Sequence, residues 1–210
     1  SSDVCSSDLT TRLSIINAML GANGVDPVST EDSTDPDVNS CLPVLESADR
    51  DIQARGWWCN QEYNLPLVPD TGGEILLPSN VLRVDPVDRS SWLVRRGNKL
   101  YDPQNHTFKI STPVYVNMVV QLPISDLPDS LGSYLEAYAV HRFYVKDDGD
   151  TDKASSLLKE RNIAFSLAYR EHIANLNLNA RDRPAVARLI GGVRFGGGIG
   201  TYNPKYPGGR

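Results

Sequence analysis

Apolar residues recur at helical spacing near the start of the chain. Between residues 9 and 20 they share one helical face, which consists of Leu9, Leu13, Ile16 and Leu20 with Ile15 and Met19 at its edge. Gly21 and Gly24 follow, and glycine favours a helix end because it accepts the left-handed backbone of a C-terminal cap. The pattern predicts a first helix from about Leu9 to Leu20.

A second helix is predicted from Asp35-Pro36 to Arg55-Gly56. Aspartate caps free backbone N–H groups, and proline at the first helical position sacrifices no hydrogen bond. The apolar face continues through Val38, Leu42, Leu45, Ala48 and Ile52. Pro43 lies inside this helix and removes the hydrogen bond to the Asn39 carbonyl group, so we expect a kink near Asn39 or a cost of about 3 kcal/mol.

From Trp57 to Leu122 the spacing changes to that of extended strands, punctuated by proline and glycine. The strongest hairpin signal pairs residues 92–95 with residues 99–101 across Arg96-Gly97-Asn98. Val114–Leu122 is the longest candidate strand and is expected at the centre of the region. Because neighbouring side chains of an extended segment point in opposite directions, we expect one of Trp57 and Trp58 to be buried and the other partly exposed.

Helical spacing returns after Leu122. Asp126-Leu127-Pro128 predicts the start of a third helix towards Val145, with one face made of Leu131, Leu135, Tyr138, Ala139 and Arg142. A fourth helix is predicted from Thr151 to about Asn177, which is about 40 Å at 1.5 Å per residue. Its apolar side consists of Leu157, Leu158, Ala164, Phe165, Ala168 and Ile173. A rod of this length is suited to lateral contacts between proteins.

This order of elements predicts an α+β fold, an α-helical bundle of about four helices with an inserted antiparallel β-rich region and an extended C-terminal arm. We expect residues 9–60 and 125–180 to form the two parts of the bundle and residues 61–124 the β-rich insertion. Residues 181–210 are expected to form a glycine-rich basic arm. With 210 residues, 40% of them hydrophobic, the chain can bury one substantial core or two small ones.

Charge is distributed unevenly along the chain. Residues 1–61 carry 3 basic and 10 acidic side chains, residues 62–124 carry 6 and 6, residues 125–180 carry 6 and 9, and residues 181–210 carry 6 and 1. The first 180 residues therefore have a net charge of −10, and the last 30 have a net charge of +5. The body is acidic and the arm is basic.

The sequence favours a soluble protein without a membrane partner. No apolar stretch approaches the roughly 20 residues that cross a bilayer, and the start lacks a signal-peptide pattern, so we expect a cytoplasmic location. Cys5, Cys41 and Cys59 form no C-x-x-C pair, and we expect reduced thiols with Cys41 and Cys59 buried. Residues 1–8 repeat Ser-Ser-Asp and are left out of the fold prediction.

The sequence offers no catalytic constellation. It has no G-x-S-x-G turn for a nucleophilic serine, and its three histidines, His106, His141 and His172, are not spaced as zinc ligands. Asp148–Asp152 resembles half of a calcium loop, but Lys153 and Lys159 occupy the glycine and glutamate positions. We therefore expect this loop to cap the fourth helix. We also expect no enzymatic activity, no cofactor and no metal.

The last 30 residues interleave aromatic with basic side chains. Gly191–Gly200 lacks the Gly-Lys-Ser/Thr end of a phosphate-binding loop. The segment either stacks on single-stranded nucleic acid or is an arm that becomes ordered on a protein partner. We favour the arm because an acidic body repels phosphate. Asp182-Arg183-Pro184 predicts the start of a short helix, and the candidate contact residues are Arg183, Val186, Leu189, Ile190, Arg194, Phe195, Tyr202 and Tyr206.

Four groups of residues resemble one protein family. They are Ile15–Gly21 with Gly24–Ser29, Ile52–Glu62, Leu67–Asp70 with Ile75–Pro78, and Arg95–Asp102. In combination, the Ile-Gln-x-Arg-Gly-Trp helix end and the Arg-Gly-x-x-Leu-Tyr-Asp hairpin are fairly specific. They are similar to the tail tubular A proteins, the adaptor or gatekeeper ring proteins of T7-like short-tailed bacteriophages. The resemblance covers roughly residues 9–180, and Pro43 departs from it.

The resemblance implies a structural virion protein that forms a dodecameric ring between the portal and the tail nozzle (tail tubular protein B), with the tail fibre as a further neighbour. Such a protein is assembled in the host cytoplasm and resides in the virion tail, and the ejected DNA passes through the ring. An acidic body suits this role, because acidic side chains that face the channel repel DNA and let it slide. The rival interpretation is a sequence-independent nucleic-acid-binding protein that uses the basic arm.

Overall fold

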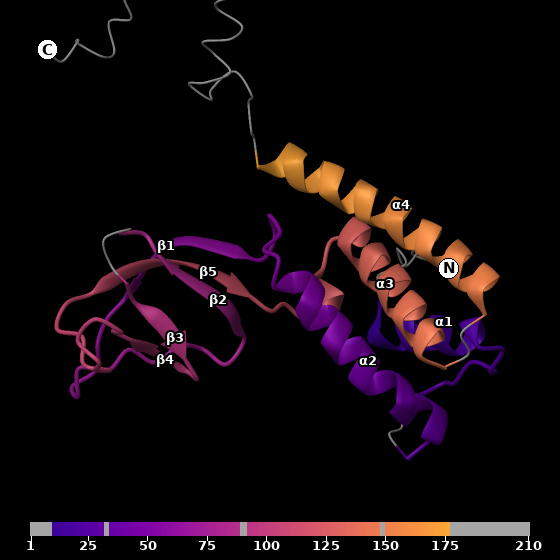
Figure 1. The fold of residues 1–210 in the computed structure, drawn as a ribbon, viewed down its shortest axis with the longest axis horizontal. Coiled ribbons are helices and arrows are strands. Elements are labelled where there is room, and N and C mark those ends of the chain that lie inside the picture. The colour runs from indigo at the N-terminus through magenta and orange to yellow at the C-terminus, as the bar shows by residue number, and fades with distance from the viewer. Residues whose placement is uncertain (1–9, 32–33, 89–91, 148–149, 177–210) are drawn as a thin grey trace, which may run out of the picture. The chain divides into compact units, whose positions relative to one another are not determined.

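The computed structural model describes residues 10–31, 34–88, 92–147 and 150–176. The chain divides into two units, residues 1–172 and residues 173–210, and the boundary lies near the end of the last helix. Within the first unit, Figure 1 shows helices α1, α2 and α3 gathered together and the strands gathered separately, joined by the chain that enters β1 and leaves β5. Helices around one core and antiparallel strands around another confirm the predicted α+β class.

Helix α1 spans Arg12–Ala22, and a reciprocal pair of hydrogen bonds sets its start. Thr11 Oγ1 accepts from the Ser14 N–H group at 3.1 Å, and Ser14 Oγ accepts from the Thr11 N–H group at 3.0 Å. This capping box satisfies N–H groups that have no partner within the helix. The helix therefore begins at Arg12 rather than at Leu9, because periodicity alone does not locate a cap.

The end of α1 is also set by backbone chemistry. Gly24 has a φ of +75°, and the Val25 N–H group donates to the Leu20 carbonyl group at 3.0 Å. The Gly24 N–H group donates to the Gly21 carbonyl group at 3.1 Å, which completes a Schellman motif. Gly21 thus lies inside α1, and the stop belongs to Gly24. The buried residues of α1 are Ile15, Ile16, Met19 and Leu20, which all belong to the predicted face, whereas Leu13 is only half-buried.

Helix α2 spans Pro36–Gln53 and begins as predicted, with Asp35 Oδ1 accepting from the Asp37 N–H group at 2.9 Å. Pro43 lies within it, and the expected kink near Asn39 stays a prediction. The buried apolar face consists of Val38, Cys41, Val44, Leu45, Ala48 and Ile52. Cys41 is buried as predicted, whereas Cys59 beyond the helix is only half-buried.

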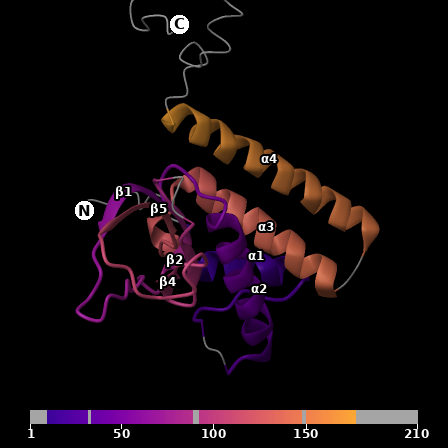
Figure 2. The same cartoon turned by 60° about the vertical axis from the view of Figure 1, so that its left-hand side comes forward.

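Helices α3 (Asp129–Asp147) and α4 (Thr151–Asn175) follow a short 3-10 turn, η1 (Ile124–Asp126). Both views show α4 running alongside α3 (Figures 1 and 2). Helix α3 is deeply packed, and its buried residues are Leu131, Tyr134, Leu135, Ala139, Val140, Phe143 and Tyr144. Helix α4 packs through fewer side chains, namely Leu157, Ala164, Phe165 and Ala168. Leu158 and Ile173, predicted on its apolar side, are each 36% exposed.

The strands form two small antiparallel sheets. The first has the order β1-β5-β2, with β1 at Gln61–Leu67, β5 at Val114–Val120 and β2 at Val81–Pro86. The predicted central strand is confirmed, because β5 pairs with both neighbours. The second sheet is the predicted hairpin, in which β3 (Val94–Arg96) pairs with β4 (Lys99–Tyr101). Its first strand begins at Val94 rather than at residue 92, and Arg96 belongs to the strand rather than to the turn. Gly97, with a φ of +63°, allows its two-residue turn.

The two halves of the first unit have separate apolar cores. The helical core lies between α1, α2 and α3, is covered on one side by α4, and includes Trp57. The second core lies under the sheets, and its buried members are Ile75, Leu77, Val81, Leu100, Ile110, Val116, Met118 and Val120. The structure thus follows the two-core alternative allowed by the chain length. The residue boundaries predicted for the bundle, insertion and arm remain expectations.

Candidate contact surfaces

A buried polar network joins α2 to the chain that leaves the sheet. The Gln53 side-chain amide donates to the Leu122 carbonyl group at 2.9 Å and accepts from the Leu122 N–H group at 2.8 Å. Asp49, one turn earlier, accepts from the amides of Gln53 at 2.7 Å and Gln121 at 2.6 Å. Gln53 is 0% exposed and Asp49 is 6% exposed, so these bonds are shielded from water. They hold the sheet in a defined position beside the helices.

Asn60 reinforces this junction from the other side. Its side-chain amide donates to the carbonyl groups of Gln53 at 3.0 Å and Val120 at 2.9 Å. Its Oδ1 accepts from the Trp57 N–H group at 2.7 Å. One buried side chain therefore connects the end of α2, the tryptophan turn and the end of β5. A lone asparagine in a sequence gives little signal of such a role.

Trp57 lies at the centre of an aromatic cluster that secures α4. Only 3% of its surface is exposed, and its Nε1 donates to the Ile52 carbonyl group at 2.9 Å. The Trp57 ring lies 6.1 Å from that of Tyr134, 6.4 Å from that of Phe165 and 5.5 Å from that of His172, between ring centres. Trp58 is half-buried, which confirms the expected contrast between the two tryptophans. The contrast arises in a turn rather than in an extended segment.

His172 on α4 bonds directly to this turn. Its Nδ1 accepts from the Trp58 N–H group at 3.1 Å, so the ring is neutral and carries its proton on Nε2. Burial lowers the pKa of His172, because the charged ring loses hydration there. The neutral form that accepts the Trp58 proton is therefore the favoured form in the folded protein.

The remaining chemical candidates have structural environments. His141 lies 3.5 Å from Arg161, and burial, followed by this positive charge, lowers the pKa of His141. His106 lies in a turn, with a φ of +54°. Asp150 Oδ1 accepts from the Asp152 N–H group at 3.0 Å, which confirms the predicted cap of α4. Among the residues that the structure describes, no three His, Cys, Asp or Glu side chains form a metal-binding group.

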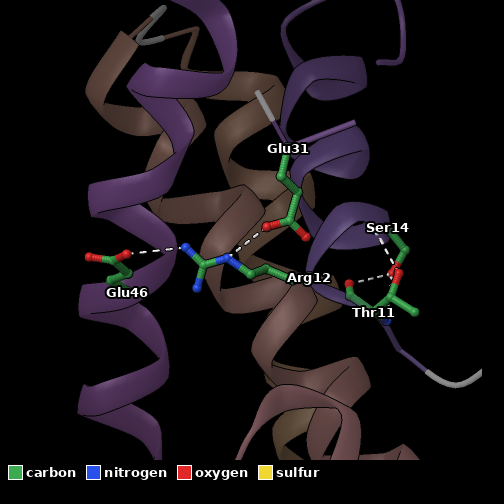
Figure 3. A network of polar contacts seen from close by, with 5 residues as sticks. All are labelled: Thr11, Arg12, Ser14, Glu31 and Glu46. Atoms are coloured by element: carbon green, nitrogen blue, oxygen red, sulfur yellow. Dashed lines mark hydrogen bonds and ion pairs between the residues drawn. The ribbon is translucent and has the colours of Figure 1, made fainter. Parts of the chain in front are cut away.

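Two surface ion pairs that share Arg12 link α1 to α2 and to the segment between them. Arg12 Nε lies 3.0 Å from a carboxylate oxygen of Glu31, and Arg12 Nη2 lies 3.1 Å from one of Glu46 (Figure 3). The Arg12 side chain is 37% exposed and the Glu46 side chain 64% exposed. Exposed ion pairs contribute little stability, on the order of 0–1 kcal/mol each. These ion pairs orient the segment that contains Glu31, and we do not interpret them as a binding site.

Large apolar side chains are exposed on both halves of the first unit. Those on strands and their loops are Tyr63, Val68, Leu76, Val87, Trp92, Val94 and Tyr115. Those on the helices are Val145, Leu158, Ile163, Leu167 and Tyr169. Ile163 is 62% exposed and Leu167 is 54% exposed, one helical turn apart on α4. Exposed apolar side chains that lie together, as Ile163 and Leu167 do, are typical of surfaces that contact other proteins.

Ile163 and Leu167 border a groove between α3 and α4. One part, of about 410 Å³, is lined by Asp129, Ser130, Ser133, Ala137, Glu160, Ile163, Ala164 and Leu167. An adjoining part, of about 310 Å³, shares Ser133, Ala137 and Glu160 and extends to Val140, Leu157 and helix α1. We call the two parts together the α3–α4 groove. It exists because small side chains recur at Ser130, Ser133 and Ala137 on one face of α3.

The charged side chains that line the α3–α4 groove are all acidic. Its charged lining residues are Asp129, Glu136 and Glu160, and its lining contains no arginine or lysine. Among the described residues, none of these carboxylates forms an ion pair. Burial raises the pKa of Glu136, because its carboxylate is partly desolvated. The groove therefore combines apolar side chains with carboxylates that have no ionic partner among the described residues.

Comparison with known proteins shows the relatives of this chain. The sequence model of the tail tubular protein family matches residues 13–172. The chain belongs to the tail tubular protein family. It is 28% identical, over 185 residues, to tail tubular protein A of Klebsiella phage KP34, and the match covers 88% of this chain and 98% of that protein. The resemblance inferred from four groups of residues is thereby confirmed.

As a tail tubular protein, the chain is a structural component of a bacteriophage tail. A structural component acts through the surfaces that contact its neighbours. The buried polar network around Gln53 and the aromatic cluster around Trp57 hold the elements that present these surfaces. None of the helices in the described ranges is long and apolar enough to cross a membrane.

Sequence and structure point to different contact residues in this tail tubular protein. All eight predicted contact residues, between Arg183 and Tyr206, lie outside the described residues. So do Asp148 and Gly149 of the candidate calcium loop. The α3–α4 groove was missed, although small residues recur at Ser130, Ser133 and Ala137. These small residues indicate a groove only when it is known that α4 packs beside this face of α3.

Proposed function

We propose that this tail tubular protein is a subunit of a dodecameric ring that joins the portal to the tail nozzle and surrounds part of the DNA ejection channel. The observation that carries the proposal is that large apolar side chains stay exposed in two different parts of one copy, on α4 at Ile163 and Leu167 and on the strands. Two different surfaces on one copy allow head-to-tail contacts, which close into a ring when the rotation is right. The tail fibre is a further expected neighbour.

The charge of the chain supports a conduit rather than a DNA-binding protein. Residues 1–180 carry 15 basic and 25 acidic side chains, a net charge of −10. Proteins that hold DNA neutralise phosphates with lysine and arginine, and each neutralised phosphate adds affinity. A ring with this net charge repels DNA wherever the acidic side chains face the channel, so the duplex slides during ejection. Assembly, rather than turnover or nucleic-acid binding, is the proposed activity.

The ring is tested by the mass of particles formed by the full chain, alone and with portal rings. We expect a species of about twelve copies in at least one of these conditions. Ile163→Asp should shift the distribution towards single copies, because it places a charge on an apolar contact surface. Asn162→Asp is the matched control, since it adds the same charge at a neighbouring exposed position that does not line the groove.

Only single copies of the wild-type protein, both alone and with portal rings, would contradict the proposed ring. Equal behaviour of the Ile163 and Asn162 variants would remove α4 from the interface and leave the strand surface as its basis. Binding of duplex DNA by the full chain at 150 mM salt, with no portal binding, would favour the nucleic-acid interpretation instead.

A further inference from the structure

We propose that the α3–α4 groove of one copy receives residues 184–190 of a neighbouring copy. This inference rests on the proposed ring and names one of its contacts. The groove is apolar, acidic and open, and the chain supplies one segment with complementary properties. That segment lies in the last 30 residues, which carry 6 basic and 1 acidic side chains.

The length of the groove matches that of a short helix. Its α3 side runs from Ser130 to Val140, which is about 15 Å along a helix. A helix of residues 184–190 is about 10 Å long. Three small side chains on α3, Ser130, Ser133 and Ala137, leave room for a second helix to approach. The groove is therefore long enough to receive two turns of helix.

The apolar pattern of the segment fits the groove walls. Val186, Leu189 and Ile190 fall on one face at helical spacing, and Pro184 suits the first helical turn. In the groove they would cover Ile163 and Leu167, which are otherwise more than half exposed. Two turns of helix are not stable alone in water, so this segment needs an apolar partner surface in order to fold.

The electrostatic match is equally direct. The groove is lined by Asp129, Glu136 and Glu160, and none of these carboxylates forms an ion pair among the described residues. Lys153 donates to the Ala22 carbonyl group at the α1 end of the groove, away from an ionic partner in the lining. Arg183 precedes the apolar face of the segment by one turn and reaches the same side. A partly desolvated carboxylate such as Glu136 gains from an arriving guanidinium group, because the pair replaces lost hydration. Charge thus favours this basic segment over the acidic remainder of the chain.

Assembly explains why the segment comes from a neighbouring copy. Docking into its own copy would leave adjacent subunits unconnected, whereas docking next door repeats one contact around the ring. The glycines after Ile190 give the arm reach, so Phe195, Tyr202 and Tyr206 remain available for a further neighbour such as the portal. Each subunit would then bind both sideways and along the tail axis.

Mixed cross-linking of the full chain tests the contact. Two preparations carry Cys5→Ser, and one also has Ala137→Cys in the groove while the other has Leu189→Cys in the segment. We expect oxidation of the mixture to yield a disulfide-linked pair of chains. Val145→Cys in place of Ala137→Cys is the control, since Val145 is 50% exposed on α3 but does not line the groove. The control pair should cross-link about tenfold less or not at all.

A second variant separates docking from folding. Glu136→Gln removes a carboxylate that is costly to bury, so the isolated chain should melt at the same or a higher temperature at pH 7. The cross-linked yield should nevertheless fall, because the segment loses an ionic partner. A purely structural Glu136 would change melting without changing the yield.

The possible outcomes distinguish this contact from the ring itself. Rings without cross-linking in the mixture would overturn the docking contact and leave the proposed function standing. Cross-linking only within a chain that carries both cysteines would also overturn it, because the segment would then occupy its own copy. Single copies throughout, with no cross-link, would reject the ring and the contact together.

Discussion

At the scale of single residues, a few side chains carry several structural tasks. Trp57 fills the end of the helical core, bonds to the α2 backbone and contacts rings from α3 and α4. His172 secures α4 to the same turn through one hydrogen bond. Neither residue lines the α3–α4 groove. Their substitution should therefore affect α4 and the surfaces it carries.

Replacing Trp57 with alanine should cost about 3–5 kcal/mol in the free energy of unfolding, because it leaves a large cavity and removes the hydrogen bond from Nε1 to the Ile52 carbonyl group. Trp58→Ala should cost clearly less, since that side chain is only half-buried. Urea unfolding of both variants measures the difference. Equal costs for the two would mean that the tryptophan turn is wrongly placed.

The His172 hydrogen bond should make stability depend on pH. Burial lowers the pKa of His172 below its ordinary value of about 6.5, so the unfolded chain binds this proton more readily than the folded protein. Its stabilising effect is therefore present above about pH 6.5 and is lost as the pH falls below that value. The wild-type melting temperature should drop more between pH 7.5 and 5.5 than that of His172→Asn, whose Oδ1 can still accept from Trp58.

His141 is retained in both proteins of that comparison, and its lowered pKa acts in the same direction. It therefore contributes an equal background that cancels in the difference. If the melting temperatures of the wild type and His172→Asn fell equally with pH, protonation of His172 would not affect stability, and the prediction would be wrong.

At the scale of elements, local backbone chemistry sets helix ends more firmly than apolar spacing does. Helix α1 shows this within four residues. Gly21 lies inside the helix, whereas Gly24 adopts a φ of +75° in the cap, and an added methyl group would meet no atom within 4 Å at either position. The two glycines thus differ in backbone conformation and not in available space.

Alanine substitutions at these two glycines should have opposite effects. Gly21→Ala should stabilise the protein by about 0.5–1 kcal/mol, since alanine favours the helix interior. Gly24→Ala should destabilise it by about 1–2 kcal/mol, because a side chain strains the left-handed backbone. Thermal unfolding of both variants gives the comparison. Destabilisation of similar size in both would show that Gly21 is not helical.

At the scale of the whole molecule, the protein combines an acidic folded body with a basic terminal segment. The described helices and strands up to His172 belong to one unit, and residues 173–210 belong to another. The body carries its own two apolar cores. Its fold should therefore persist without the last residues, whereas its assembly should not.

A chain that ends after Ala180 should keep the wild-type melting temperature within about 2 °C, because it retains both cores. Its binding to portal rings should weaken, since it lacks the aromatic and basic side chains of the arm. Co-sedimentation with portal rings and a thermal scan test the two parts. Unchanged binding would refute the docking role, and a large loss of stability would assign the arm to the core.

Much of the fold could be predicted because its signals are local. The Asp35-Pro36 start, the Gly97 turn and the β-branched run of β5 each depend on neighbouring residues, and each was confirmed. The start of α1 was misplaced, because apolar spacing does not locate the Thr11 cap. The exposure of Leu158 was also unexpected, since spacing cannot reveal how few residues of α4 are covered.

The sequence by itself determined the fold class, the family and the acidic body with its basic end, because composition and short motifs carry that information. Only the tertiary structure decided which apolar residues stay exposed and where they gather. Ile163 and Leu167 border a groove because small residues on α3, more than 25 positions earlier, leave space beside them. Likewise, Gln53 and Leu122 bond across 69 positions of the chain. Such relations depend on distances in space, which a linear pattern does not contain.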